Sequence, residues 1–152
     1  MRYKSGSWQR PYPAGNEAIG FGEGDGEVTG EITGSLLWAN YPRGREDGVW
    51  TPNVRGQITA AEGQVVLISI HGQSVLEAAP GSRRAILARV ELSSGEAQYS
   101  WLNTCFCVGE GEIDEETGVA WLNLFVCVNE EALGPPAIGA EAPHRFRQLG
   151  RA

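Results

Sequence analysis

The sequence lacks the long apolar runs that mark membrane proteins and secretory signals. None of its apolar runs approaches the roughly 18 residues that a transmembrane helix needs, so we expect no membrane span and no membrane partner. Residues 1–13 carry basic side chains but no apolar stretch follows them, so we expect no secretory signal. These absences favour a cytoplasmic protein.

Basic residues, cysteine and histidine are also scarce. The formal net charge is −7, with no cluster of basic residues, so the chain would repel nucleic acid and we expect no nucleic-acid partner. The cysteines are Cys105, Cys107 and Cys127, without a C-x-x-C pair, and the histidines are His71 and His144. This set is too sparse for a structural zinc site, so we expect no metal and no cofactor. Three free thiols suit a reducing cytoplasm.

Glycine, by contrast, is abundant, and it recurs between short runs that favour strands. The 21 glycines are about twice what average usage of roughly 7% gives, and they follow no triplet period. Polar and apolar residues alternate along 27–33 and 53–60, as in half-exposed strands. The pattern predicts an all-β protein, a closed antiparallel barrel of about eight strands with little helix.

The stretch Gln98–Val128 is the centre of the predicted sheet. Two apolar runs, rich in aromatic residues and cysteine, flank a polar connection that ends in Asp114–Gly118. Aromatic and branched residues favour strands, and the connection has the residues of a turn. We therefore predict one long hairpin. Tyr99, Trp101 and Asn103 would share one face of its first strand because side chains alternate with a period of two.

The rest of the chain divides into three parts. We expect residues 1–15 to form an extended arm without periodicity, which lies on the barrel or on a neighbouring subunit, and residues 16–130 to form the barrel. The Pro- and Gly-rich residues 131–152 are expected to form a tail that is ordered only if it packs on another part of the structure. Apolar side chains in the arm and the tail, namely Trp8, Tyr12, Ile138 and Phe146, would be covered by a second subunit, so we predict a homo-oligomer.

Three connections are predicted from their turn residues. Residues 22–26 (GEGDG) and 61–63 (AEG) are expected to be turns, and 72–83 is expected to be a long connection with about one helical turn.

The span from about Gly20 to Val128 resembles the family called domain of unknown function 3237. The resemblance is carried by Trp38 after a Gly-containing strand, by Asp47-Gly48 and Arg55 further on, and above all by Tyr99-Ser100-Trp101-Leu102-Asn103 followed by Val108-Gly109-Glu110-Gly111. It implies a calycin-like antiparallel β-barrel and no established activity. The chain departs from the family pattern at Leu37 and Asn53, where acids are common, and at Gly56, where Tyr is common.

The candidates for ligand binding are Trp38, Arg55, Tyr99, Trp101 and Asn103. Of these, Tyr99, Trp101 and Asn103 combine apolar area with hydrogen-bonding tips on one strand face, as in many small-ligand pockets. The opposing interpretation is a packed core whose Tyr and Trp tips bond to the backbone. Arg55 bears on a ligand only if it faces the barrel lumen, where a buried charge needs a partner.

The candidates for catalysis are His71, Arg55 and Tyr99, and no motif marks a nucleophile. The opposing interpretation of His71 is a hydrogen-bonded structural residue. Redox, phosphoryl-transfer and acyl-transfer motifs are missing, so an enzyme here would be a cofactor-free lyase, isomerase or cyclase.

Three functional hypotheses remain open on the sequence alone. The first is an intracellular barrel that binds a small, partly apolar molecule in its lumen. The second is an enzyme of the kind just named on the same scaffold, and the third is a structural or oligomeric module whose barrel is filled by side chains.

Overall fold

The computed structural model describes residues 1–77, 82–127 and 146–151. Strands make up most of this chain: β1 Arg2–Gln9, β2 Ala18–Gly30, β3 Gly34–Asn40, β4 Arg43–Gly44, β5 Trp50–Thr51, β6 Asn53–Ala60, β7 Val65–Leu76, β8 Arg83–Ser93, β9 Cys107–Asp114, β10 Val119–Cys127 and β11 Phe146–Arg151. Two 3-10 segments accompany them, η1 Ala61–Gly63 and η2 Ala97–Thr104. Within this part, neither helical segment has the length and apolarity needed to cross a membrane.

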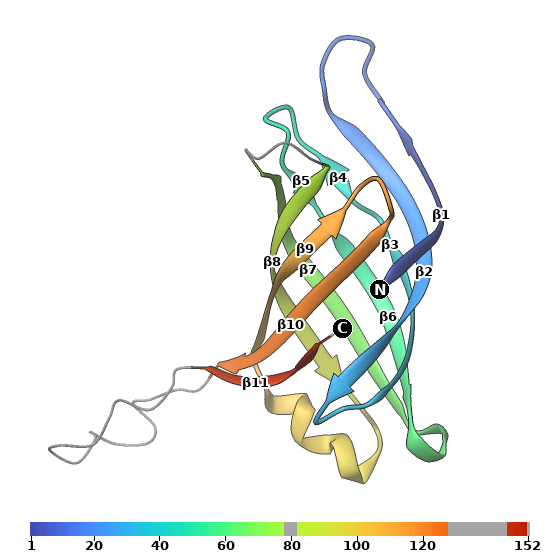
Figure 1. Ribbon diagram of the computed structural model, residues 1–152, viewed down its shortest axis with the longest axis vertical. Helices are drawn as coiled ribbons and strands as arrows, with labels where there is room; N and C mark the ends of the chain where they lie inside the picture. Colours follow the sequence, from blue (N-terminus) through green and yellow to red (C-terminus); the bar gives the residue numbers. More distant parts are fainter. Residues whose placement is uncertain (78–81, 128–145, 152) are drawn as a thin grey trace, which may run out of the picture.

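The strands close into an antiparallel barrel with eight positions around the ring (Figure 1). Seven positions follow the chain as an up-and-down meander, β2-β3-β6-β7-β8-β9-β10. The eighth, between β10 and β2, is shared by the first and last strands, β1 nearer one end of the barrel and β11 nearer the other. The prediction of a closed, all-β antiparallel barrel of about eight strands with little helix is confirmed.

Both terminal segments form strands that pair with the barrel, so the arm lies on the barrel and the end of the tail is ordered by packing on it. Residues 2–9 pair with β2 along most of their length, from Arg2 opposite Asp25 to Gln9 opposite Ile19. β11 pairs with both β10 and β2, and it buries Leu149 in the core. Neither segment shows alternation of polar and apolar residues in the sequence. Each nevertheless pairs with the edges of β2 and β10, whose backbone N–H and C=O groups would otherwise lack partners. Ile138 and His144 lie outside the described residues.

Two of the predicted connections are also wrong, whereas a third is confirmed. The expected turn at 22–26 is the middle of β2, and the expected connection at 72–83 is largely strand, because β7 continues to Leu76 and β8 begins at Arg83. Residues 78–81 of that connection lie outside the described residues. Residues 61–63 form η1 and join β6 to its antiparallel neighbour β7, as the sequence predicted.

The long hairpin is shorter than predicted, because its first part is helical. Residues 97–104 form η2, and strand pairing begins only at Cys107, opposite Val126. Tyr99 and Leu102 are three residues apart, which is one turn of a 3-10 helix, so both side chains point the same way and are buried. Both side chains belong to the core cluster, and η2 lies at one end of the barrel (Figure 1). We call this the closed end, and the end near β4 and β5 the open end.

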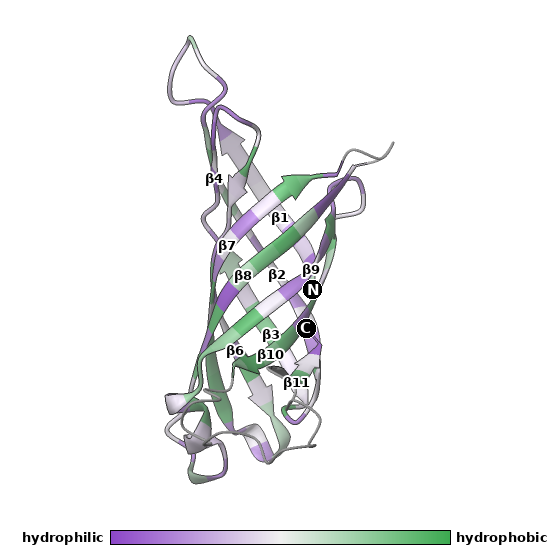
Figure 2. Cartoon of the chain, turned by 90° about the vertical axis from the view of Figure 1, so that its left-hand side faces the viewer, coloured by the Kyte–Doolittle hydropathy of each residue, from purple (hydrophilic) through white to green (hydrophobic). Residues whose placement is uncertain are grey.

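The inward positions near the closed end are filled by aliphatic side chains. Hydrophobic and hydrophilic bands succeed one another along the strands (Figure 2), as expected for a barrel with a packed interior and a solvated exterior. The most deeply buried side chains form one cluster: Val28, Ile32, Leu36, Ile58, Val66, Ile68, Val90, Leu102, Cys107 and Leu124. The lumen is therefore solid at this end, and any space must lie towards the other.

Candidate ligand cavity at the open end of the barrel

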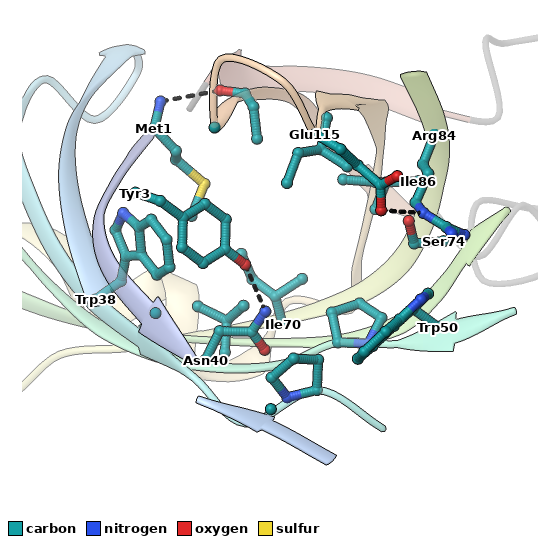
Figure 3. A pocket seen from close by; sticks show the side chains of 18 of the residues that line it. Met1, Tyr3, Trp38, Asn40, Trp50, Ile70, Ser74, Arg84, Ile86 and Glu115 are labelled. Carbon is teal, nitrogen blue, oxygen red and sulfur yellow. Dashed lines mark hydrogen bonds and ion pairs between the residues drawn. The ribbon is translucent and has the colours of Figure 1, made fainter. Parts of the chain in front are cut away.

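A cavity of about 480 Å³ lies in the barrel lumen towards the open end (Figure 3). Most of its wall is aromatic or aliphatic, with contributions from Tyr3, Trp38, Trp50, Val54, Ile70, Ile86 and Ile113. Its size falls within the range of about 300–1,000 Å³ typical of small-molecule sites, which are also mainly apolar. These residues come from seven different strands, so only the closed barrel assembles the wall.

Inward-facing glycines on β2 keep this half of the lumen open. At the closed end the inward positions carry Val, Ile and Leu, whereas β2 presents Gly20, Gly22 and Gly24 to the cavity half. A Cβ atom at Gly22 would lie 2.4 Å from Cε1 of Tyr3, and one at Gly24 would lie 2.6 Å from Cζ2 of Trp38. The absence of side chains at these glycines therefore leaves room for the two rings to pack against the barrel wall.

The rings of Tyr3 and Trp38 form a fixed aromatic corner of the cavity. Their centroids are 4.5 Å apart and their planes meet at 87°, which is the edge-to-face geometry that aromatic pairs prefer. The indole Nε1 of Trp38 donates to the backbone oxygen of Asp25 at 3.3 Å, so the indole is satisfied without a ligand. Trp38 was a predicted ligand residue, and the structure places it on the cavity wall.

A chain of hydrogen bonds leaves the proton of the Tyr3 hydroxyl available to the cavity. The backbone N–H of Asn53 donates to Oδ1 of Asn40 at 2.9 Å, which fixes the orientation of that amide. Nδ2 of Asn40 therefore donates to the Tyr3 hydroxyl oxygen at 2.8 Å. Burial raises the pKa of Tyr3, so the phenol keeps its proton at neutral pH and is free to donate it.

One ion pair lines the same cavity near its mouth. Nε of Arg84 lies 2.5 Å from Oε1 of Glu115, and Nη1 of Arg84 donates to the backbone oxygen of Gly48 at 2.9 Å. The Arg84 side chain is only 11% exposed, whereas that of Glu115 is 45% exposed. The positive charge on the wall is thus neutralised by the protein itself (Figure 3).

Ser74 contributes a buried hydroxyl that lacks a hydrogen-bond partner in the described part of the chain. The residue is 5% exposed and lines the cavity. It faces Ile86 across the β7–β8 pairing, one inward position from Arg84. Because an unsatisfied buried polar group costs about 1–3 kcal/mol, this hydroxyl is a feature that needs an explanation.

The structure places Arg55 and His71 on the outer face of the barrel, so Arg55 does not meet the condition for a role in ligand binding, which was that it faces the lumen. Their neighbours Val54 and Ile70 take the inward positions of β6 and β7. Arg55 donates to the hydroxyl of Ser69 on the outer face. The pKa of His71 is lowered, first by burial and then by the positive charges of Arg55 and Arg89.

Tyr99, Trp101 and Asn103 do not share a strand face, because they lie on η2. Tyr99 is buried in the core at the closed end, and Trp101 packs against that core. Asn103 is bonded to the backbone of Ser94. None of the three lines the cavity, so they do not form one site with Trp38.

The sequence analysis missed most of the polar residues of the cavity. Each of three polar residues lies an even number of positions from an inward-facing apolar residue on the same strand, so the alternation along the strand could have predicted that it faces inward. The pairs are Asn40 with Trp38, Ser74 with Ile70, and Arg84 with Ile86. Tyr3 gave no such signal, because its segment shows no periodicity and its position depends on pairing with β2.

The cysteines form no metal site with other residues in the part of the chain that the structure describes. Among the residues described, no group of three His, Cys, Asp or Glu side chains is placed to hold a metal ion. Cys107 is fully buried, and burial raises the pKa of its thiol to about 11. Such a thiol behaves as a small apolar core residue.

Comparison with known proteins finds no match to a family model, to a curated protein or to a solved structure. The resemblance to domain of unknown function 3237 therefore stays a prediction, and the function must be argued from the cavity.

Proposed function

We propose that this protein binds a small, partly apolar molecule in the open half of its barrel. The observation that carries the proposal is the cavity of about 480 Å³, in which an aromatic wall is combined with two hydroxyl groups, of Tyr3 and Ser74, that have unused hydrogen-bonding capacity. Sites for small ligands have this composition, mostly apolar with a few placed polar groups.

The ligand's apolar body would lie between Trp38 and the aliphatic side chains of Ile70 and Ile86. Its polar end would accept the proton of Tyr3 or bond to Ser74. The closed end of the barrel is filled, but the described side chains leave this cavity open, which favours binding over a purely structural module.

Isothermal titration with 2-naphthol, a flat molecule with one hydroxyl, tests the proposal. Ile86→Trp places a large ring in the cavity, whereas Leu87→Trp is its matched control, because Leu87 is the next residue of β8 and is 66% exposed on the outer face. We expect binding to the natural sequence and to Leu87→Trp, and loss of binding in Ile86→Trp. Equal binding by the two variants, or no binding by the natural sequence, would overturn the proposal.

A second candidate is catalysis by the same cavity, as a cofactor-free lyase, isomerase or cyclase. The specific observation in its favour is the Tyr3 phenol, which is oriented by Asn40 and keeps its proton for donation. Turnover that is lost in Tyr3→Phe while ligand binding persists would support it.

We also propose that the protein acts in the cytoplasm as a homo-oligomer. Trp8 and Tyr12 are 61% and 59% exposed in the single chain, so a second subunit would have apolar surface to cover there. Sedimentation of a monomer at high micromolar concentration would refute the oligomer without touching the binding proposal.

A further inference from the structure

We propose that the cavity selects electrically neutral ligands that carry oxygen, such as alcohols and ketones, and that Glu115 sets this preference by occupying Arg84. The inference rests on the proposed binding function and adds the ligand's chemical class.

Arg84 is the side chain that would bind a ligand carboxylate, but its guanidinium is already paired with groups of the protein. Its Nε bonds to Glu115 at 2.5 Å and its Nη1 to the oxygen of Gly48 at 2.9 Å, and the side chain is almost fully buried. A carboxylate that enters the cavity loses its hydration, and only an unpaired cation or several donors would offset that loss. The ligand carboxylate would have to displace Glu115 from Arg84 or lie beside the negative charge of Glu115.

The α-amino group of Met1 is the other cationic group on the cavity wall. It donates to the backbone oxygen of Ala120 at 3.0 Å, and Figure 3 shows this bond at the edge of the cavity. Burial is the main cause that lowers the pKa of this amine. Its bond to Ala120 is matched by a second one, from the N–H of Ala120 to the oxygen of Met1 at 3.0 Å, so this amine is held as part of the strand pairing.

The side-chain groups that remain available in the cavity are neutral. The Tyr3 hydroxyl accepts from Asn40 and so offers a proton, and the Ser74 hydroxyl can donate or accept. A carbonyl oxygen would take the proton of Tyr3, and a hydroxyl would pair with Ser74. Two such groups on an apolar wall suit a neutral molecule with one or two oxygen functions.

Glu115→Gln separates the charge of Glu115 from its shape. The amide oxygen can still accept from Nε of Arg84, but the guanidinium charge is no longer neutralised, and Arg binds carboxylates well. Glu116→Gln is the matched control, because Glu116 is the neighbouring exposed acid and its loss changes the net charge equally. Both positions are on the surface at the β9–β10 turn, so both variants should fold.

The test is titration of each protein with 2-naphthol and with 2-naphthoate near neutral pH, where the first probe is neutral and the second is an anion of similar shape. We expect the natural sequence and Glu116→Gln to bind 2-naphthol at least about tenfold more tightly than 2-naphthoate. In Glu115→Gln the affinity for 2-naphthoate relative to that for 2-naphthol should rise about tenfold, about 1.4 kcal/mol, whereas Glu116→Gln should keep the ratio of the natural sequence.

The two ways of failing are distinguishable. The inference is wrong if the natural sequence binds the two probes equally or prefers the anion. It is also wrong if Glu115→Gln gains no affinity for 2-naphthoate relative to 2-naphthol. In each of these cases the proposed binding function stands. If the natural sequence binds neither probe, the proposed function fails and the inference fails with it.

Discussion

The side chain of Asn103 exchanges two hydrogen bonds with the backbone of Ser94. Its Oδ1 accepts from the N–H of Ser94 at 2.8 Å, and its Nδ2 donates to the oxygen of Ser94 at 2.9 Å. This pair ties the last turn of η2 to the segment that follows β8. Asn103 thus holds the closed end of the barrel together and does not face the cavity.

We therefore expect Asn103→Ala to destabilise the protein by about 1–2 kcal/mol, since two exposed hydrogen bonds are lost, and to leave 2-naphthol affinity unchanged. Urea unfolding measures the first effect and calorimetry the second. Ser100→Ala serves as the control, because its hydroxyl bonds only within η2, to the oxygen of Ala97. Weakened binding with unchanged stability would contradict this role and restore Asn103 as a ligand residue.

Local chemistry explains what the sequence predicted correctly. The β9–β10 turn was predicted at 114–118, and Oδ1 of Asp114 accepts there from the N–H groups of Glu116 at 2.9 Å and Thr117 at 3.0 Å. Gly118 has a φ of 66°, which suits glycine. Such a turn is determined by neighbouring residues, so five letters suffice to recognise it.

Interactions between distant segments explain what was missed. The aromatic residues of η2 have a high strand propensity, and only the spacing of Tyr99 and Leu102 distinguished a 3-10 turn from a strand. The cavity joins Tyr3, Trp38 and Arg84, which are far apart in the chain and meet because the barrel closes through β1. No local pattern predicts that closure.

The inward-facing Gly24 offers a test of how β1 and Trp38 are accommodated. A Cβ at this position would lie 2.0 Å from the backbone oxygen of Arg2 and 2.6 Å from Trp38. We expect Gly24→Ala to cost about 1–3 kcal/mol of stability through overpacking, and to weaken 2-naphthol binding because the indole must move. In Gly95→Ala a Cβ meets nothing within 4 Å, so this control should keep its stability. Equal melting of the two variants would show that β1 does not pack as described.

The buried thiol of Cys107 should make the stability depend on pH in the alkaline range. Its pKa is about 11 in the folded protein, against an ordinary value of 9.0. Between these values the unfolded chain has released the proton and the folded chain still holds it, so the free energy of unfolding falls as pH rises, by about 1–3 kcal/mol in total.

Unfolding in urea from about pH 8 to pH 11 measures this effect, in the natural sequence and in Cys107→Ala. Other groups titrate in both proteins, so the difference between their unfolding free energies isolates Cys107. That difference should be constant below about pH 9 and shrink above it. A difference that stays constant throughout would show that the thiol titrates normally.

Loss of the Ser74 hydroxyl should have opposite effects on the stability of the free protein and on its affinity for a ligand. Its hydroxyl is buried and has no partner in the part of the chain that the structure describes, so without a ligand it costs free energy and contributes little packing. We expect Ser74→Ala to leave the stability of the free protein unchanged or raise it by up to about 1 kcal/mol. The same change should weaken 2-naphthol binding about two- to tenfold, because one neutral hydrogen bond to the ligand is lost.

Ser69→Ala provides the control on the same strand. Ser69 lies on the outer face of β7, where its hydroxyl accepts a hydrogen bond from Arg55, so its loss should lower stability slightly and leave binding unchanged. Thermal melting with and without 2-naphthol then separates the two serines, because the ligand should raise the melting temperature of Ser69→Ala more than that of Ser74→Ala. If Ser74→Ala instead lowers the stability of the free protein by more than about 1 kcal/mol, its hydroxyl already has a structural partner. The cavity would then offer Tyr3 alone as a neutral donor, and the ligand's polar end would have to be placed against that ring.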